Sequence, residues 1–329
     1  MDVVSFFAGA GGLDLGFERA GFDIPWACEY DKNIWDTYRA NHPNTYLDTR
    51  SIVDIEVYDL PEIVHGIIGG PPCQSWSLAG TMNGIEDPRG QLFYDYLRLI
   101  NDKQPAFFVA ENVPGMVSSR HIKEFNTIIN RFQECGYRVN YKLLNAWDYG
   151  APQDRKRVII VGYRNDLNME FNFDNLIQVD NKLVLRDAIG DLPEPLPALE
   201  KNYTNGETEG VLNNEYFIGS FSSIFMSRNR IRTWEEPSFT IQASGRQAPI
   251  HPASDPMVKV DKDKWEFTGP NYRRLSVREC ARIQGFPDDF RFIYDKVDMG
   301  YKMIGNAVPV QLSQAVASQI MRDLRPIFE

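Results

Sequence analysis

The residue of this chain best placed to act as a nucleophile is a cysteine in a turn-forming segment. Cys73 follows the run Gly-Gly-Pro-Pro at positions 69–72. The prolines fix the backbone before it, the glycines leave room around it, and a thiolate attacks electrophilic carbon well. The preceding apolar run predicts a strand, which would place Cys73 at the strand's carboxyl end, where ligands bind. The alternative is a small buried hydrophobic residue, which the polar, turn-forming flanks disfavour.

An acid and two arginines follow at the next strand boundaries. Glu111 ends the next apolar run, so neighbouring strands would put it beside Cys73. A Cys–Glu pair without a nearby histidine does not fit a cysteine protease, but it fits thiolate addition to a heteroaromatic ring whose nitrogen the acid protonates. Strand alternation puts Arg155 and Arg157 on one face, where they could hold a phosphate or the polar edge of a base. An ordinary basic strand edge is the alternative.

A glycine-rich turn and two acids indicate a nucleoside cofactor. The run Phe-Ala-Gly-Ala-Gly-Gly at 7–12 allows a tight turn and close backbone approach at a helix N-terminus. Its spacing is not the GxGxxG of nicotinamide dehydrogenases, so no pyrophosphate is demanded. Glu29 can accept both ribose hydroxyls, Asp48 can accept from an adenine amine, and Phe7 or Tyr30 can cover a base. Taken alone, each acid is more simply interpreted as a solvated loop residue. Taken together with the glycine-rich turn, the two acids fit the cofactor S-adenosylmethionine.

The elements that must position these residues alternate along the first 165 residues. Buried strands are predicted at 3–6, 24–28, 66–68, 106–110, 139–144 and 158–161, with helices at 13–20, 33–41, 92–101 and 122–135. This order predicts an α/β fold: a parallel, Rossmann-like sheet with helices on both faces. Residues 170–270, rich in Pro, Gly, Asn and aromatics, predict a smaller irregular domain. Apolar spacing over 308–324 predicts a helix that packs back on the first domain.

Composition limits the class of protein. The chain has 329 residues, enough for about two domains, and 43% hydrophobic and 24% charged residues, which excludes disorder and collagen. No apolar run approaches the ~18–20 residues of a membrane span, and the N-terminus does not resemble a signal peptide. Four cysteines without paired spacing fit a reducing cytoplasm and argue against a zinc site or disulfides, so no metal is expected.

The charge is unevenly distributed. A net charge of −10 taken alone argues against a nucleic-acid partner. However, residues 219–234 contain Arg228, Arg230 and Arg232 without an acid, and residues 271–282 contain four arginines against one glutamate. Such segregation allows a basic cleft on an acidic protein. Scattered surface arginines are the alternative.

Together these residues resemble the DNA (cytosine-5) methyltransferases over nearly the whole chain and in the family's order. The matching segments are 7–12 and Glu29 for the cofactor, Pro72-Cys73-Gln74 for the nucleophile, Glu111-Asn112-Val113, Gln153-x-Arg155-x-Arg157, and the late motifs at 273–287 and 300–309. Asp48-Thr49-Arg50 departs from the family's usual Gly-Asp-Ile at the adenine acid. The last motif returns to the cofactor pocket in this family.

The resemblance implies site residues and a domain division. Catalysis is expected at Cys73, Glu111, Arg155 and Arg157, and S-adenosylmethionine is expected to contact Phe7, Gly9, Gly11, Gly12, Leu13, Glu29, Tyr30, Asp48, Thr49, Pro72, Leu92, Asn306 and Ala307. Residues 1–170 and 296–329 would form the catalytic domain. Residues 171–295 would form a target-recognition domain and hinge.

Two segments, 225–230 and 243–247, resemble the bacterial GGCC-specific (Hae-III type) restriction–modification enzymes. Arg228, Arg230 and Arg246 are therefore expected to read guanines in double-stranded DNA, although arginines that contact only phosphate are an alternative. The resemblance implies a monomeric bacterial cytoplasmic enzyme that methylates a flipped cytosine. A transfer-RNA cytosine-5 methyltransferase and a catalytically silent DNA-binding relative are the alternatives; the intact Cys73, Glu111 and Arg157 argue against the second.

Overall fold

A seven-stranded sheet forms the larger part of the molecule. The computed structural model describes residues 1–72, 88–206 and 210–328, so Cys73 lies outside the described residues. In spatial order the strands are β3 (Tyr46–Asp48), β2 (Asp23–Cys28), β1 (Asp2–Phe6), β4 (Gly66–Gly69), β5 (Phe107–Asn112), β8 (Lys156–Arg164) and β6 (Tyr137–Asn145). The strands predicted from the apolar runs are thus confirmed.

One strand, β8, departs from the predicted parallel sheet. β1 to β5 pair in parallel, but β8 runs antiparallel to both β5 and β6. The expectation of a wholly parallel sheet was wrong here. The physical reason is the connection between β6 and β8, residues 146–155, which is too short for the helical crossover that parallel neighbours need.

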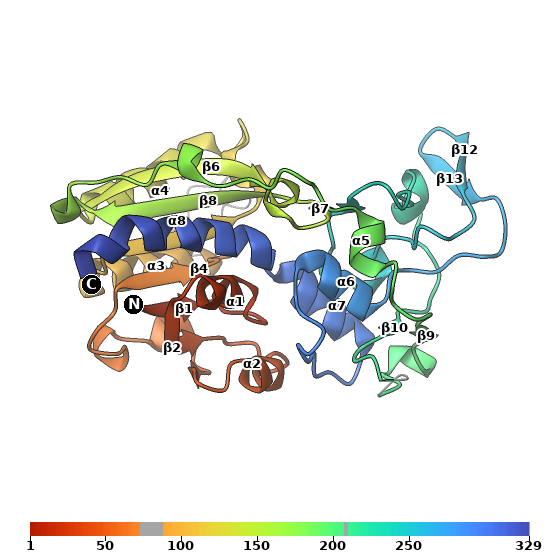
Figure 1. Ribbon diagram of the computed structural model, residues 1–329, viewed down its shortest axis with the longest axis horizontal. Coiled ribbons are helices and arrows are strands. Elements are labelled where there is room, and N and C mark those ends of the chain that lie inside the picture. The colour runs from red at the N-terminus through yellow and green to blue at the C-terminus, as the bar shows by residue number, and fades with distance from the viewer. Residues whose placement is uncertain (73–87, 207–209, 329) are drawn as a thin grey trace.

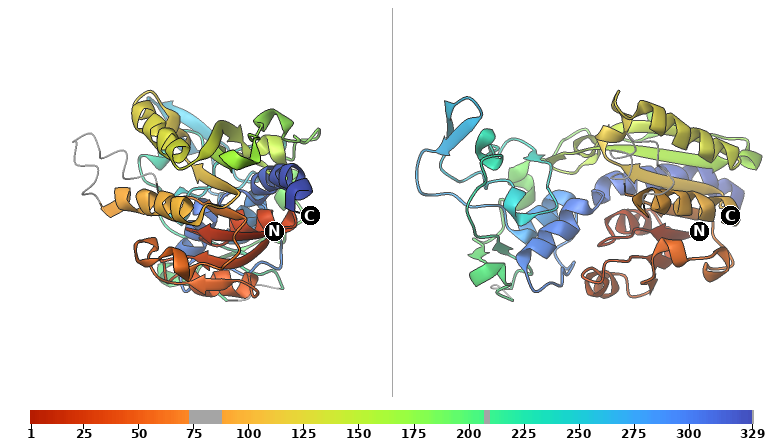
Figure 2. Two further views of the ribbon diagram at one scale, coloured as in Figure 1. Left: turned by 90° about the vertical axis from the view of Figure 1, so that its left-hand side faces the viewer. Right: turned by 180° about the vertical axis from the view of Figure 1, so that it is seen from behind.

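Two helical layers bury both faces of the sheet. α1 (Gly12–Arg19) and α8 (Val310–Phe328) cover one face, while α3 (Pro88–Lys103) and α4 (Ile122–Glu134) cover the other. Figure 2, left, shows these layers on opposite sides of the strands. Side chains alternate accordingly, with Val3 and Phe107 in the first core and Val4 and Phe108 in the second. Burial on both faces explains why the strands read as unbroken apolar runs.

The C-terminal helix completes the sheet domain, as predicted. α8 lies against α1, and the Ser313 hydroxyl donates to the Leu13 carbonyl at 2.6 Å. Gly16 makes this approach possible, because a Cβ there would lie 2.3 Å from the Ser313 side chain. α2 (Trp35–Asn41) lies between β2 and β3 in the chain.

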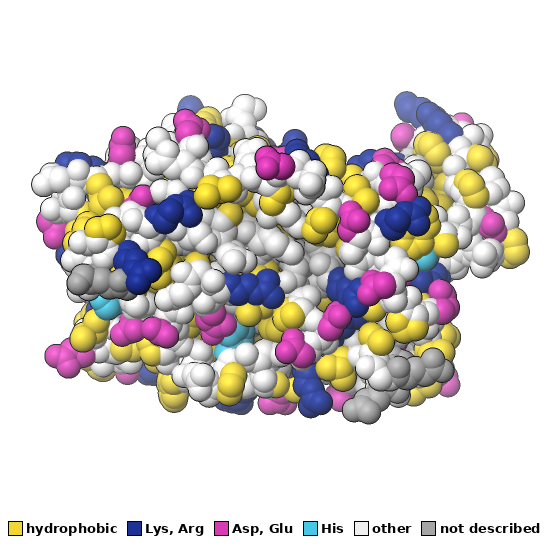
Figure 3. Space-filling model, viewed as in Figure 1, with side chains coloured by type: hydrophobic (Ala, Val, Ile, Leu, Met, Phe, Trp, Pro, Cys, Tyr) yellow, Lys and Arg dark blue, Asp and Glu magenta, His cyan; other side chains and the backbone are white. Residues whose placement is uncertain are grey.

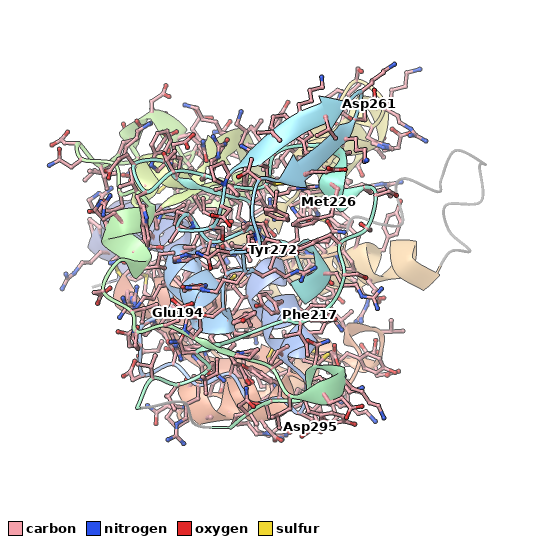
Figure 4. The ribbon with its side chains drawn as sticks, turned by 90° about the vertical axis from the view of Figure 1, so that its right-hand side faces the viewer. Glu194, Phe217, Met226, Asp261, Tyr272 and Asp295 are labelled. Carbon is pink, nitrogen blue, oxygen red and sulfur yellow. The ribbon has the colours of Figure 1, made fainter. Side chains whose placement is uncertain are left out.

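A second, irregular part lies beside the sheet (Figure 1). It contains α5 (Leu185–Ile189), α6 (Val277–Gln284), α7 (Val297–Asn306), the short strands β9 (Leu196–Pro197), β10 (Glu215–Tyr216) and β11 (Ser238–Phe239), and the hairpin β12 (Met257–Asp261) and β13 (Lys264–Phe267). Figure 4 views this end, with Phe217 and Tyr272 near its centre and Asp261 on the hairpin.

One core cluster joins both sides of the expected domain boundary. Phe217 and Ile241 of the second part pack with Tyr301 and Ile304 of α7. The division at 295/296 stays a prediction, and α7 shares its core with the second part. No helix in the described residues is long and apolar enough to cross a bilayer.

Candidate active site

A cavity of about 720 Å³ opens at the carboxyl ends of the central strands. Its walls come from the segments that follow β1, β2 and β4, from the end of β5 and the segment after it, and from α7 and the turn between α7 and α8. The lining residues are Phe7–Gly9, Gly12, Leu13, Glu29, Asp31, Ile34, Gly70–Pro72, Glu111–Val113, Gly115, Met116, His121, Lys302 and Asn306–Val308. The volume is that of a typical small-molecule site. Segments far apart in sequence therefore meet at the edge where parallel strands present their ends.

The turn after β1 forms the floor of the cavity. Phe7 and Gly9 both have left-handed backbones, with φ of 54° and 58°. The Gly9 N–H donates to Glu29 Oε2 at 2.9 Å, which ties the turn to the end of β2. A Cβ on Gly12 would lie 2.7 Å from the Val308 carbonyl oxygen, so glycine at this position lets the α7–α8 turn close over the helix N-terminus.

Glu29 lies in the cavity wall with its carboxylate already oriented. Oε1 accepts from the Asp31 N–H at 2.7 Å, and Oε2 accepts from Gly9. Burial raises the pKa of the Glu29 carboxyl above its usual value, and the two backbone donors oppose that shift. Each oxygen keeps a lone pair free, so the carboxylate can also accept two hydroxyls of a ligand.

The structure brings eight of the thirteen predicted cofactor residues to the cavity and places five outside its lining. Phe7, Gly9, Gly12, Leu13, Glu29, Pro72, Asn306 and Ala307 line the cavity, whereas Gly11, Tyr30, Asp48, Thr49 and Leu92 do not. Tyr30 is 73% exposed. The Arg50 guanidinium pairs with the Asp48 carboxylate: Nη2 lies 2.7 Å from Oδ2, and Nε donates to both carboxylate oxygens. The adenine role of Asp48 stays a prediction, and it requires this carboxylate to serve Arg50 as well.

Glu111 lines the cavity and forms an ion pair with Arg157. Arg157 Nε lies 2.7 Å from Glu111 Oε1, and both side chains are 12% exposed. The antiparallel pairing of β5 with β8 produces this contact, because it sets the end of β5 beside the start of β8. A Cβ on Gly70 would lie 3.3 Å from Glu111 Oε2, so glycine there keeps the second oxygen open.

Arg155 lies elsewhere, contrary to the expectation that it shares a face with Arg157. Its side chain is 1% exposed and donates to the backbone carbonyls of Ile241, Gly305 and Ala307. Burial, and then the charge of Arg157, lower the pKa of Arg155 well below its usual value. The strand is interrupted at Arg155, between β7 (Gln153–Asp154) and β8, so simple alternation does not hold. We therefore remove Arg155 from the groups expected to touch the substrate.

The three arginines predicted to read DNA differ in exposure and in whether their guanidiniums are already hydrogen-bonded. Arg228 and Arg246 are exposed, and within the described part of the chain no side-chain hydrogen bond or ion pair engages either guanidinium. Arg230 instead donates from Nε to the Phe225 carbonyl at 2.7 Å and from Nη2 to Ile224 at 3.0 Å. Its guanidinium also stacks over the Phe225 ring. Burial and the charge of Arg228 lower the pKa of Arg230.

Comparison with known proteins identifies the family. The model of the C-5 cytosine-specific DNA methylases matches residues 1–322. The chain belongs to this family. It is 57% identical over 331 residues to the type II methyltransferase M.MthTI of Methanothermobacter thermautotrophicus, covering 100% of this chain and 99% of that protein. It is 54% identical to the type II methyltransferase M.FnuDI of Fusobacterium nucleatum, covering 98% and 95%.

The fold of the methylase also matches solved structures. A structure titled as a prophage-encoded DNA modification methyltransferase of E. coli superposes with a TM-score of 0.77 at 24% identity, covering 99% of each chain. The family match shows that the protein is a DNA (cytosine-5) methyltransferase, an enzyme acting on double-stranded DNA, and the superposition shows its fold. The family as a whole takes its methyl group from S-adenosylmethionine.

Two contacts in the methylase site were not anticipated from the sequence. Asn112 Nδ2 donates to the Pro71 carbonyl at 3.0 Å, which ties the end of β5 to the turn before Cys73. Lys302 Nζ lies 2.7 Å from Asp31 Oδ2 at the cavity wall. Asn112 could have been found from its place beside Glu111 in the motif. The Asp31–Lys302 pair joins residues on two distant segments, and nothing in their local sequence signals it.

Proposed function

We propose that this methylase transfers the methyl group of S-adenosylmethionine to C5 of a cytosine flipped out of a duplex. The observation that carries the proposal is that Glu111, which is paired with Arg157, lines the same cavity as Glu29. The Pro71–Pro72 turn that leads to Cys73 lines this cavity too. A stacked base cannot enter such a recess, so the target cytosine must leave the helix.

The residues on the Glu29 side fit the cofactor. Glu29 offers charged acceptors for ribose hydroxyls, and the Gly9–Gly12 turn allows the nucleoside close to the backbone. Asn306 and Ala307 close the cavity from the α7–α8 turn. When bound, S-adenosylmethionine supplies a methyl group on a positively charged sulfur. No pyrophosphate-binding turn is needed for such a ligand.

The residues on the other side fit addition to a pyrimidine. In the proposed reaction the Cys73 thiolate forms a bond to C6, and the ring electrons move to C5 while Glu111 holds a proton at N3. Arg157 donates to the carbonyl oxygen of the base and keeps Glu111 in place through their ion pair. C5 then takes the methyl group, a base removes the C5 proton, and the C6–sulfur bond breaks to return the thiolate.

We further propose GGCC as the target, read by Arg228 and Arg246. Among the described residues no partner engages either guanidinium, so both can offer paired donors to guanine O6 and N7 in the major groove. Arg230 more simply holds the turn that presents Arg228, because two of its nitrogens already bond to that turn. The relatives named as type II methyltransferases support a role in protecting DNA from a partner restriction enzyme. That the enzyme is monomeric and acts in the cytoplasm stays a prediction.

Trapping tests the chemistry. A GGCC duplex with 5-fluorocytosine at the target should form a complex with the protein and S-adenosylmethionine that survives denaturation, because fluorine cannot leave C5 as a proton does. Cys73→Ser protein is the matched control and should form none. A stable complex with the serine variant, or none with wild type on a duplex that it methylates, would rule out the covalent route.

A further inference from the structure

A buried arginine bonds the cofactor side of the molecule to the recognition side. Arg155 Nη1 donates to the Ile241 carbonyl at 2.8 Å, and Nη2 donates to Gly305 at 2.6 Å and to Ala307 at 3.1 Å. Ala307 lines the cavity, whereas Ile241 lies in the chain that leads to Arg246. One planar guanidinium with several donors thus fixes both segments.

Two buried glutamines complete the connection. Gln284 Nε2 donates to Ile304 at 3.1 Å and to Ala307 at 2.6 Å, while its Oε1 accepts from Gln153 Nε2. Gln153 Oε1 accepts from the Ile241 N–H at 2.8 Å. Both glutamines are fully buried. We call Gln153, Arg155 and Gln284 the polar hub.

Helix α7, whose C-terminal end the hub holds, also contacts the recognition segment along its length. At its start, Asp298 Oδ1 accepts from the Ser244 hydroxyl at 3.1 Å and from the Gly245 N–H at 2.8 Å. At its end, a Cβ on Gly305 would lie 2.3 Å from the backbone carbon of Gln242. Residues 242–245 therefore lie along α7 in direct contact, and Arg246 follows immediately.

The same helix forms part of the cofactor cavity. Lys302, in the middle of α7, lines the cavity and pairs with Asp31, and Asn306 and Ala307 at its end line the cavity too. A ligand that orders these residues must act on a helix whose other side carries the recognition segment. Packed elements of this kind shift as units, since buried contacts do not deform continuously.

We propose that the polar hub and α7 couple occupancy of the cofactor cavity to DNA recognition by residues 240–246. Arg155 is the central positioning residue of this coupling and does not touch either ligand. The proposal rests on the proposed function, since it takes the two ligands to be the methyl donor and DNA. Coupling is reciprocal: each ligand then tightens the binding of the other by the same factor.

Calorimetry with the product S-adenosylhomocysteine measures the coupling. Its affinity is determined with and without a duplex carrying the site that the wild-type protein methylates, expected to be GGCC. We expect the duplex to tighten binding by about fivefold or more in wild type, the usual range of such coupling. We call the affinity for S-adenosylhomocysteine with the duplex, divided by the affinity without it, the coupling ratio. In Arg155→Lys this coupling ratio should fall toward one, because an ammonium group cannot bond three carbonyls in a plane.

Arg278→Lys is the matched control. Arg278 is equally buried and donates to the carbonyls of Leu212, Pro287 and Phe290, none of which lines the cavity. Both variants should lose thermal stability, but only Arg155→Lys should lose the coupling. If Arg155 had only a structural role, both lysine variants would keep the wild-type ratio of affinities with and without the duplex.

Gly305→Ala provides a second route if Arg155→Lys does not fold. The added methyl group must displace residues 242–243 from α7, so this variant should also lose coupling. Full coupling in either folded variant would overturn the proposal. A wild-type protein that methylates DNA without any coupling would overturn it as well, while leaving the proposed function intact. A wild-type protein that methylates no DNA would refute both.

Discussion

Glu111 and Arg157 show how a catalytic pair is made from residues on two strands. Each was identified from its motif, but the 2.7 Å contact between them depends on the antiparallel pairing of β5 with β8. The ion pair leaves Glu111 Oε2 facing the space above Gly70. A carboxylate held in this way meets a ring nitrogen without first losing side-chain freedom.

Replacing the nucleophile should stop the reaction without preventing binding. We predict that Cys73→Ser abolishes methyl transfer while DNA affinity stays close to wild type, because a serine hydroxyl is far less acidic than a thiol. Transfer of a labelled methyl group and a filter-binding assay measure the two properties. Turnover near the wild-type rate in the serine variant would exclude an anionic sulfur nucleophile.

Replacing Glu29 should weaken cofactor binding through two losses. Glu29→Ala removes acceptors for ribose and also frees the Gly9 and Asp31 amides. At ~1.5–3 kcal/mol for each hydrogen bond to a charged group, we predict at least a roughly tenfold weaker affinity for S-adenosylmethionine. The affinity of Glu29→Gln, which keeps one acceptor oxygen, should lie between those of wild type and Glu29→Ala. Equal affinity of all three proteins in calorimetry would remove Glu29 from the site.

At the scale of elements, the sequence predicted the positions of the strands and helices better than the side-chain contacts between them. Continuous apolar runs located the strands, and helical spacing located α8, because both patterns reflect local burial. The reversed direction of β8, and with it the position of Arg155, depends on a short connection whose path is not encoded in any periodicity. The Asp48–Arg50 and Asp31–Lys302 pairs likewise depend on side-chain geometry that local patterns do not carry.

The contact between α1 and α8 should depend on the absence of a side chain at Gly16. Gly16→Ala places a methyl group 2.3 Å from Ser313, and overpacking of this kind costs about 1–3 kcal/mol. Gly115→Ala is the control, since a Cβ there meets nothing within 4 Å. Denaturant titration should show a loss for the first variant only. Equal stability of Gly16→Ala and wild type would contradict the packing described.

At the scale of the whole molecule, a catalytic sheet and a recognition part share one acidic chain. On the face in Figure 3, basic and acidic side chains are interspersed over both parts. The net charge of −10 therefore coexists with local arginines that can bind DNA. The exposed Arg228 and Arg246 are such arginines, and both belong to the recognition part.

Those two arginines should determine specificity, and Arg230 should not. Arg228→Ala or Arg246→Ala should relax discrimination at one base pair, by about 1–3 kcal/mol for a lost bidentate guanine contact. Arg230→Ala should slow methylation of all sites alike, because it loosens the turn. Rates on GGCC and its single-base variants measure both effects. Uniform slowing by the Arg228 and Arg246 variants, with a smaller salt dependence, would show that they contact phosphate instead.

Bisulfite sequencing of DNA from cells that express the protein tests the central claim most directly, since it reports the reaction and the target together. The account predicts that one cytosine in each GGCC site resists conversion in cells with wild-type protein, and that all cytosines convert in cells with Cys73→Ser protein. Protection at another sequence would contradict the assigned specificity. Full conversion of every cytosine in cells with the folded wild-type protein would contradict cytosine-5 methylation itself.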